Sequence, residues 1–226
     1  MSAGPVQEIA QIAIVAVPIV IAITLHEAAH GYIARHFGDD TAERAGRLSL
    51  NPLRHVDLFG TILLPALLIL SHTGFVFGWA KPVPVNFAAL RNPKLDMVWV
   101  AAAGPGMNIL LAAVSVLAIY LPSLFGVAVG GIALELFWSS VQINLVLAML
   151  NMLPVPPLDG GRVAVGLLPQ PLSAALASLN RFGMLLVLAI FVALPYLGID
   201  VFHWLVQGPV EYIERILMTL LGLHYG

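Results

Sequence analysis

Two histidines and a glutamate stand close together in the segment His26-Glu27-Ala28-Ala29-His30. On a helix, positions i and i+4 lie on one face a turn apart, so both imidazoles could bind the same divalent ion. Glu27 would project beside them, where it could act as a base on water activated by that ion. The motif is short, and it remains a hypothesis until the rest of the chain supports it.

A catalytic zinc ion commonly has two histidines and a carboxylate as protein ligands, with a fourth position left open. The chain contains no cysteine, so any transition metal must be held by His, Asp or Glu. Asp159 is the best candidate for the third ligand, because it directly follows an uncharged apolar run that ends at Leu158. Asp-Gly pairs are also common in turns. Asp57 therefore remains the main rival and Glu43 a weaker one.

The composition excludes several classes of protein. Hydrophobic residues make up 60% of the 226 residues, and only 10 Lys or Arg and 12 Asp or Glu carry charge. Soluble domains have roughly 45–50% apolar and about 25% charged residues. Too few charged groups are present to cover a water-soluble surface, and the net charge of −2 does not fit a nucleic-acid binder. Most of the chain must therefore lie in a lipid bilayer.

The apolar runs predict an all-α polytopic membrane protein with about four to six transmembrane segments. About 20 apolar residues cross the hydrocarbon layer, which places three core helices at about 9–34, 97–121 and 136–158. Further C-terminal helices are expected at about 182–224. The part after residue 200 is a short span, a re-entrant piece or an interfacial helix. We expect one membrane-embedded domain over residues 1–226.

The apolar run 58–70 is too short for a comfortable span, and the basic residues favour a re-entrant loop. If this run dips into the membrane and returns, nine of the ten Lys and Arg residues lie on one side. The positive-inside rule assigns that side to the cytoplasm. We therefore expect an N-terminus outside and a re-entrant insertion at about 58–86 on the cytoplasmic side.

A small membrane-associated β-hairpin is predicted within this insertion. Phe75-Val76-Phe77 and Val83-Pro84-Val85 flank a glycine-containing turn, a pattern typical of hairpins. Proline cannot donate a hydrogen bond to a neighbouring strand, so the arm with Pro82 and Pro84 belongs at an edge.

Three motifs resemble those of the site-2 protease family of intramembrane zinc metalloproteases. They are HEAAH at 26–30, AGPGMN at 103–108 and NMLPVPPLDGG at 151–161. Their order and spacing are intact over about residues 20–165. The last motif is specific, whereas HExxH alone would be much weaker.

Two further stretches resemble a compact prokaryotic branch of this family that lacks PDZ and CBS domains. They are GRLSLNPLRHVDLFGT at 46–61 and FGWAKPVPVN at 77–86. The resemblance implies a three-helix core in which His26, His30 and Asp159 bind one zinc ion per chain. It also implies that Glu27 is the catalytic base.

The resemblance assigns roles to three more residues. Asn151 is expected to contact the substrate backbone near the reacting carbonyl, and Asn108 and Gly104 to shape helix packing around the site. Asn144 lies seven residues before Asn151 on the same helical face, and we expect it to serve packing.

The predicted function is that of a zinc-dependent endopeptidase in a prokaryotic cell membrane. The implied reaction is regulated intramembrane proteolysis, the hydrolysis of a peptide bond in or near the transmembrane segment of a single-pass membrane protein. The active site would be accessible from the cytoplasm, and the hairpin edge could pair with an unwound substrate.

A transporter would also carry intramembrane His, Glu, Asp and Asn, but we find no inverted repeat. A metal-binding membrane protein without proteolytic activity is the other alternative.

Overall fold

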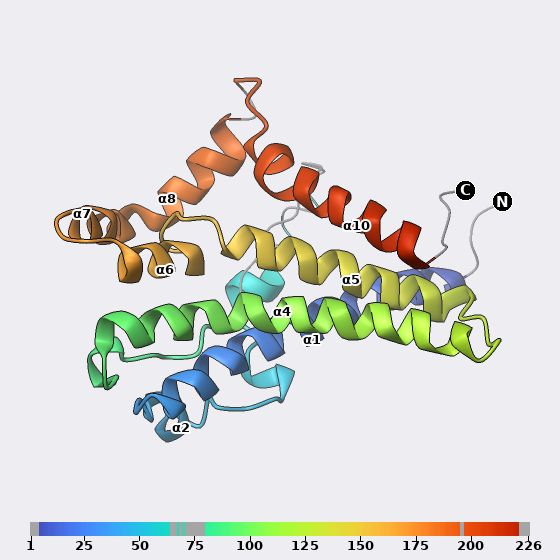
Figure 1. Cartoon of the computed structure of the whole chain (residues 1–226), viewed down its shortest axis with the longest axis horizontal. Coiled ribbons are helices and arrows are strands. Elements are labelled where there is room, and N and C mark those ends of the chain that lie inside the picture. The colour runs from blue at the N-terminus through green and yellow to red at the C-terminus, as the bar shows by residue number, and fades with distance from the viewer. Residues whose placement is uncertain (1–4, 64–66, 68–69, 71–79, 195–196, 222–226) are drawn as a thin grey trace.

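Three long helices form the centre of the fold (Figure 1). The computed structural model describes residues 5–63, 67, 70, 80–194 and 197–221. Among these residues, the helices long and apolar enough to cross a membrane are found in α1 (Pro5–His36), α4 (Pro93–Leu124) and α5 (Gly131–Asn151). The bent pair Leu172–Phe182 and Leu185–Phe191 would add a fourth span if it crosses as one unit. The described residues contain no strand, which confirms the prediction of an all-α polytopic membrane protein.

Polar side chains face the interior of this bundle, whereas large apolar side chains cover its outside. Helices α1, α4 and α5 contact one another in all three pairs. Asn108 and Asn144 are at most 1% exposed, while Ile12 is 68% exposed and Leu110 is 54% exposed. Lipid cannot form hydrogen bonds with amides, so buried polar groups must find partners inside the bundle. The same helices therefore offer apolar surface to the bilayer and a polar interior to the site.

Helix α5 ends earlier than the sequence predicted. Its last helical residue is Asn151, whereas the apolar run suggested a helix to residue 158. Three prolines between residues 152 and 158 interrupt the run, because proline lacks the N–H that a helix needs and clashes with the preceding turn. The chain turns there and starts a separate short helix, α6 (Asp159–Leu167). This turn brings Asp159 back toward the bundle.

The C-terminal part consists of several short helical pieces. They are α7 (Leu172–Ser178), η4 (Leu179–Phe182), α8 (Gly183–Leu188), η5 (Ala189–Ala193), η6 (His203–Gln207) and α10 (Gly208–Leu221). Helix α10 packs on α5, where Val210 joins a buried cluster with Val141 and Leu145. Helix α6 packs on the start of α4, and a Cβ atom on Gly166 would lie only 2.3 Å from Cγ2 of Val98.

The segment between α1 and α4 contains short helical turns. They are α2 (Thr41–Arg44), η1 (Pro52–Arg54), η2 (Leu58–Leu63) and η3 (Phe87–Ala89). The predicted hairpin falls partly on residues 71–79, which lie outside the described residues. The other arm, residues 80–86, has no regular secondary structure.

Residues 80–86 are held against the rest of the protein by backbone hydrogen bonds. The N–H of Lys81 donates to the carbonyl of His55 (2.8 Å), and the N–H of Asn86 donates to Oδ2 of Asp39 (2.6 Å). Asp39 is only 1% exposed, and its Oδ1 accepts from the N–H of Thr41 (2.9 Å). Burial raises the pKa of Asp39, but the hydrogen bonds from Thr41 and Asn86 outweigh burial and lower it below its usual value. The ionised Asp39 carboxylate therefore anchors this segment to the end of α1.

Replacement of Asp39 by alanine should release residues 80–90, because both carboxylate acceptors are lost. Hydrogen bonds to a charged group contribute about 1.5–3 kcal/mol, so we expect amide hydrogen exchange there to accelerate by roughly 10–100-fold at neutral pH. In the wild type the pKa of Asp39 is lower in the folded state than in the unfolded state. The hydrogen bonds to its carboxylate therefore contribute their full stability above a pH of about 4, and this contribution is lost as the pH falls further. Exchange is measured by mass spectrometry. Asp40→Ala, which removes an exposed partner of Arg44, is the control, and equal exchange in both variants would refute the anchor.

Candidate functional site

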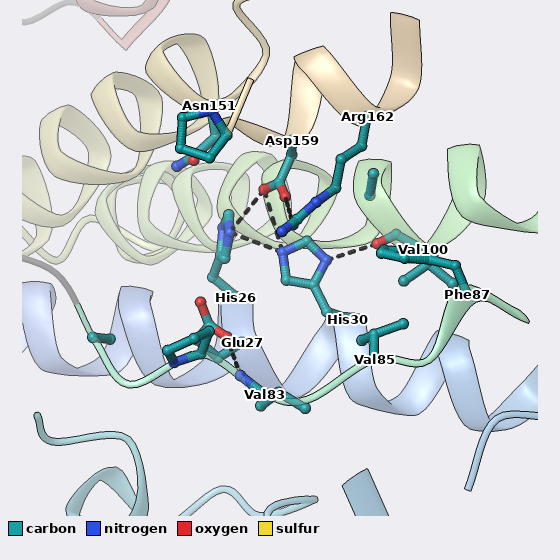
Figure 2. Close-up of a pocket in the computed structure, with 14 residues that line it drawn as sticks. His26, Glu27, His30, Val83, Val85, Phe87, Val100, Asn151, Asp159 and Arg162 are labelled. Atoms are coloured by element: carbon teal, nitrogen blue, oxygen red, sulfur yellow. Dashed lines mark hydrogen bonds and ion pairs between the residues drawn. The ribbon is translucent and has the colours of Figure 1, made fainter. Parts of the chain in front are cut away.

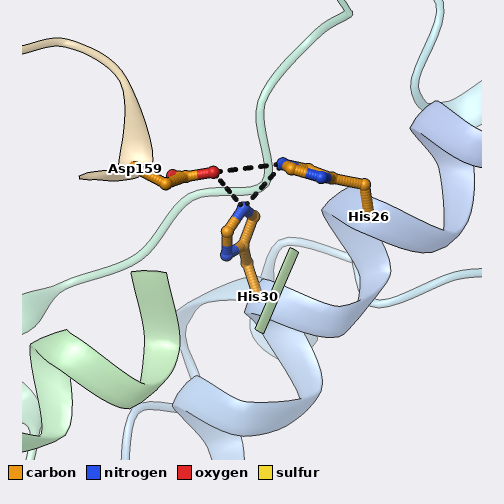
Figure 3. Close-up of side chains that lie close together, drawn as sticks. All are labelled: His26, His30 and Asp159. Atoms are coloured by element: carbon orange, nitrogen blue, oxygen red, sulfur yellow. Dashed lines mark hydrogen bonds and ion pairs between the residues drawn. The ribbon is translucent and has the colours of Figure 1, made fainter. Parts of the chain in front are cut away.

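Three buried side chains converge, His26 and His30 from α1 and Asp159 from the start of α6 (Figure 3). Nε2 of His26 lies 3.2 Å from Oδ2 of Asp159, and Nε2 of His30 lies 3.3 Å from the same oxygen. The two Nε2 atoms are 3.1 Å apart. Each of the three residues is at most 8% exposed. Within the described part of the chain, they form the one group of three or more His, Cys, Asp or Glu residues close enough to share a metal ion.

The two rival acids for the third ligand lie elsewhere and have other partners. Asp57 accepts a hydrogen bond from the N–H of Gly60 (2.6 Å) at the start of η2. Glu43 lies in α2 and forms an ion pair with Arg35 (2.8 Å). Neither acid belongs to the group of His26, His30 and Asp159.

The depth of the site follows from the helices that carry it. His30 lies six residues before the end of α1, and it contacts Val100, seven residues after the start of α4. At 1.5 Å per residue, both positions are roughly 10 Å along the helices from their ends. The two histidines are therefore set back from the helix ends, and Asp159 reaches them from the first residue of α6.

The glycines that follow Asp159 allow its helix to start close to the preceding turn. A Cβ atom on Gly160 would lie 2.2 Å from the carbonyl oxygen of Met152. A Cβ atom on Gly161 would lie 2.5 Å from the backbone nitrogen of Pro156. Any other residue at either position would push α6 away from the turn. The Asp-Gly-Gly sequence is thus a packing requirement that fixes where the Asp159 carboxylate lies.

Each of the three groups is also held from outside the site. Nδ1 of His30 lies 2.7 Å from the carbonyl oxygen of Val100, and Nδ1 of His26 lies 2.6 Å from Oδ1 of Asn108. Nη1 of Arg162 donates to Oδ1 of Asp159 (3.1 Å), which leaves Oδ2 directed at the histidines. Partners of this kind orient the ligands in metal sites. Arg162 was not identified from the sequence. It lies three residues after Asp159, a spacing that makes two side chains neighbours on a helix.

The guanidinium of Arg162 donates a hydrogen bond to Asp159 and places a positive charge beside it, which favours the ionised carboxylate. A carbonyl oxygen can only accept, so Nδ1 of His30 must carry the hydrogen toward Val100, and its Nε2 offers a lone pair to the site. Electron-pair donors therefore face one another at the centre of the group, which is the arrangement that binds a cation.

The spacing of the three donors fits zinc. Tetrahedral zinc with ligands at 2.0–2.2 Å places neighbouring ligand atoms about 3.3 Å apart. The three observed separations are 3.1, 3.2 and 3.3 Å. Histidine and carboxylate are also the donor types of catalytic zinc sites. The residues present therefore fit this metal in both chemistry and geometry.

Gly104 of α4 keeps the space next to the two imidazoles open. A Cβ atom at this position would lie 2.5 Å from Nε2 of His26 and 2.5 Å from Nε2 of His30. From the family resemblance, Gly104 was expected to shape helix packing around the site. Its closeness to both ring nitrogens depends on how α4 crosses α1, and no local sequence signal reports that crossing.

Glu27 lies beside this group at the wall of a cavity of about 310 Å³ (Figure 2). Its Oε2 accepts a hydrogen bond from the N–H of Val83 (2.8 Å), in the segment that Asp39 anchors. The cavity thus lies between α1, the chain at 80–87 and the start of α6. It is lined by His26, Glu27, His30, Ala80, Pro82, Val83, Val85, Phe87, Val100, Ala101, Asn151, Pro157, Asp159 and Arg162.

The two asparagines of α5 have different surroundings. Asn151 lines the cavity, and its Nδ2 donates to the carbonyl of Leu147 one turn earlier (3.0 Å). Asn144 is buried away from the cavity lining and accepts a hydrogen bond at Oδ1 from Nδ2 of Asn108 (2.8 Å). The side chain expected to meet substrate therefore borders the cavity, and the one expected to pack is in the helix interface.

Substitution of Gly104 by alanine should weaken zinc binding by at least about tenfold, because the new methyl group would force both imidazoles apart. Zinc in purified protein is measured by atomic absorption after dialysis against a chelator. Gly106→Ala on the same helix is the matched control, since a Cβ atom there meets nothing within 4 Å. Full zinc retention in Gly104→Ala would show that this space does not matter for the metal.

Comparison with known proteins gives consistent results. The model of peptidase family M50 matches residues 126–191. The chain is 40% identical to "Putative zinc metalloprotease YwhC" of Bacillus subtilis (strain 168) over 180 residues, and this alignment covers 78% of each protein. It is 32% identical over 178 residues to "Putative zinc metalloprotease Rip2" of Mycolicibacterium smegmatis. That alignment covers 76% of this chain and 64% of the relative. Rip2 of Mycobacterium tuberculosis (strain H37Rv) is 30% identical over 189 residues, 82% of this chain and 70% of its own.

No solved structure matches the chain. The sequence relatives nevertheless extend over most of its length. Together with three apolar helices that can cross a membrane, they establish an integral membrane enzyme. The chain belongs to peptidase family M50, the site-2 protease family, and it is a zinc metalloprotease.

Proposed function

We propose that this protein hydrolyses a peptide bond in or near the transmembrane segment of a membrane-protein substrate. One zinc ion per chain would be held by His26, His30 and Asp159, and Glu27 would be the general base. The observation that carries the proposal is the meeting of three electron-pair donors within 3.3 Å, beside Glu27 and roughly 10 Å in from the helix ends. Ionisable groups at such depth are costly, and they usually serve function.

A bound zinc ion supplies Lewis acidity, which makes water nucleophilic at neutral pH and polarises a carbonyl group. The protein must then supply a base and hold it in place. The N–H of Val83 occupies Oε2 of Glu27, and Oε1 accepts no hydrogen bond from the described residues. Oε1 is therefore the oxygen that would take a proton from the attacking water and pass it to the leaving amine.

Asn151 is the candidate donor for the substrate carbonyl. Its amide borders the cavity on the side of α5, opposite the segment 80–87. A fixed N–H donor near a developing oxyanion typically contributes 10²–10³-fold to the rate. The present bond from Asn151 to the carbonyl of Leu147 is local to α5, so the side chain could exchange it for a bond to substrate.

The substrate has to present an extended backbone, because a helix shields its carbonyl groups. The segment 80–86 has no regular secondary structure of its own and borders the cavity through Val83 and Val85. Pro82 and Pro84 have no N–H groups, so a partner strand could bond only to the remaining backbone groups of the segment. We propose that an unwound single-pass substrate lies along this segment on its way to Glu27.

Water must reach the site from one side of the membrane. Most Lys and Arg residues lie at the helix ends nearest the site or in the segments that join them, including Arg35, Arg44 and Arg91. By the positive-inside rule these ends face the cytoplasm. We therefore propose a site in a prokaryotic cell membrane that is open to cytoplasmic water.

Glu27→Gln should retain zinc and lose at least about 10²-fold in cleavage rate, the usual contribution of a general base. Glutamine can still accept the hydrogen bond from Val83, so the change removes the base and leaves the local contact. Cleavage of a single-pass model substrate by purified protein in proteoliposomes is followed by gel, and zinc is measured on the same samples.

Glu43→Gln is the matched control, because Glu43 lies in α2 and pairs with Arg35 outside the cavity. It should cleave like the wild type. Substantial turnover by Glu27→Gln would disprove the role of Glu27, and cleavage without zinc in the wild type would disprove the mechanism.

A further inference from the structure

A chain of buried amides leads from His26 into the helix interface. Oδ1 of Asn108 lies 2.6 Å from Nδ1 of His26, and Nδ2 of Asn108 lies 2.8 Å from Oδ1 of Asn144. Nδ2 of Asn144 lies 2.8 Å from the backbone carbonyl oxygen of Ser140. Asn108 is 0% exposed and Asn144 is 1% exposed. One hydrogen-bonded line thus joins α1, α4 and α5 and ends on a backbone group.

That backbone group fixes the direction of every bond in the line. The carbonyl of Ser140 can only accept, so Asn144 must turn its NH₂ group toward it and its oxygen toward Asn108. Asn108 must then turn its own NH₂ group toward Asn144 and its oxygen toward His26. The carbonyl of Ala22, 3.5 Å from Nδ2 of Asn108, favours the same orientation.

The end of the line determines the state of His26. An amide oxygen can only accept, so Nδ1 of His26 must carry the hydrogen and donate it. Nε2 is then left with its lone pair, directed at Asp159 and His30. His30 reaches the same state through the backbone carbonyl of Val100. Because a backbone carbonyl cannot flip and a side-chain amide can, His26 needs a second residue to hold its partner.

We infer that Asn108 is a positioning residue for the metal, with Asn144 holding the Asn108 amide in the productive orientation. This inference rests on the proposed binding of zinc by His26. In metal sites, such partners of a histidine typically change metal affinity by 10–100-fold when they are removed. A role in helix packing alone would affect folding stability, but it would not depend on whether residue 108 can accept a hydrogen bond.

The test measures zinc affinity in the full-length protein, using competition with a chromophoric chelator, together with the melting temperature of the metal-free form. Asn108→Leu keeps the size of the side chain but cannot accept from His26, and it should weaken zinc binding by roughly 10–100-fold. Asn108→Asp keeps an acceptor for Nδ1, and it should bind zinc within about threefold of the wild type. The absorption spectrum of the cobalt-substituted protein should change in Asn108→Leu and be retained in Asn108→Asp.

Two other variants complete the test. One changes a second residue of the hydrogen-bonded line, and the other is a control outside it. Asn144→Ala frees the amide of Asn108 to flip, so zinc binding should weaken by several-fold. Ser123→Ala on α4 is the control, because the hydroxyl of Ser123 bonds the carbonyl of Tyr120 and no member of the line. It should leave zinc affinity unchanged. If Asn108→Leu does not fold, Asn144→Ala and Asn108→Asp decide the matter.

Three outcomes would overturn the inference. They are wild-type zinc affinity in Asn108→Leu, wild-type affinity in Asn144→Ala, and a loss in Asn108→Asp as large as that in Asn108→Leu. The proposed function fails in a different way. In that case His26→Ala would bind zinc as tightly as the wild type, whatever the asparagine variants do.

Discussion

The structure depends on one electrostatic constraint, the meeting of three electron-pair donors in a space buried between helices. Nε2 of His26, Nε2 of His30 and Oδ2 of Asp159 lie within 3.3 Å of one another. Without a cation, their lone pairs would face each other in a medium where such an arrangement is costly. A zinc ion held by these three atoms would turn that cost into attraction, and the site would then also join α1 to α6.

The residues around this contact support it in two ways. Glycines leave room for it, and hydrogen-bond partners orient its donor atoms. Gly104 leaves room beside the rings, and Gly160 and Gly161 let α6 start close to the turn. Val100 and Asn108 face the outer nitrogens of the two histidines, so the inner ones are free for the metal. The bundle is polar inside and apolar outside because every buried polar group must find a partner within it. Packing and chemistry are thus set by the same few residues.

Much of this arrangement could be predicted from the sequence. The apolar runs predicted the three central helices, and the i, i+4 spacing of His26 and His30 predicted that both rings share a face. The position of Asp159 after the third run, together with the family resemblance, favoured it over Asp57 and Glu43. In the structure Asp159 contacts both histidines, and the other two acids do not. These features are local or depend on the order of the spans along the chain.

Other features could not be predicted because they depend on how helices cross. Neither the closeness of Gly104 to both imidazoles nor the line through Asn144 has a signal in any short window of sequence. The end of α5 at Asn151 was also missed, since the apolar run continues through prolines that a hydropathy pattern does not penalise. The contact of Val83 with Glu27 joins segments 56 residues apart and arises from the path of the chain between α1 and α4.

The most direct test of the account is an anomalous diffraction map of the zinc-loaded protein, recorded at the zinc absorption edge. The account predicts one peak per chain, about 2.0–2.2 Å from Nε2 of His26, Nε2 of His30 and Oδ2 of Asp159. A peak away from these atoms, or one bound by the histidines with Asp159 out of bonding reach, would contradict it.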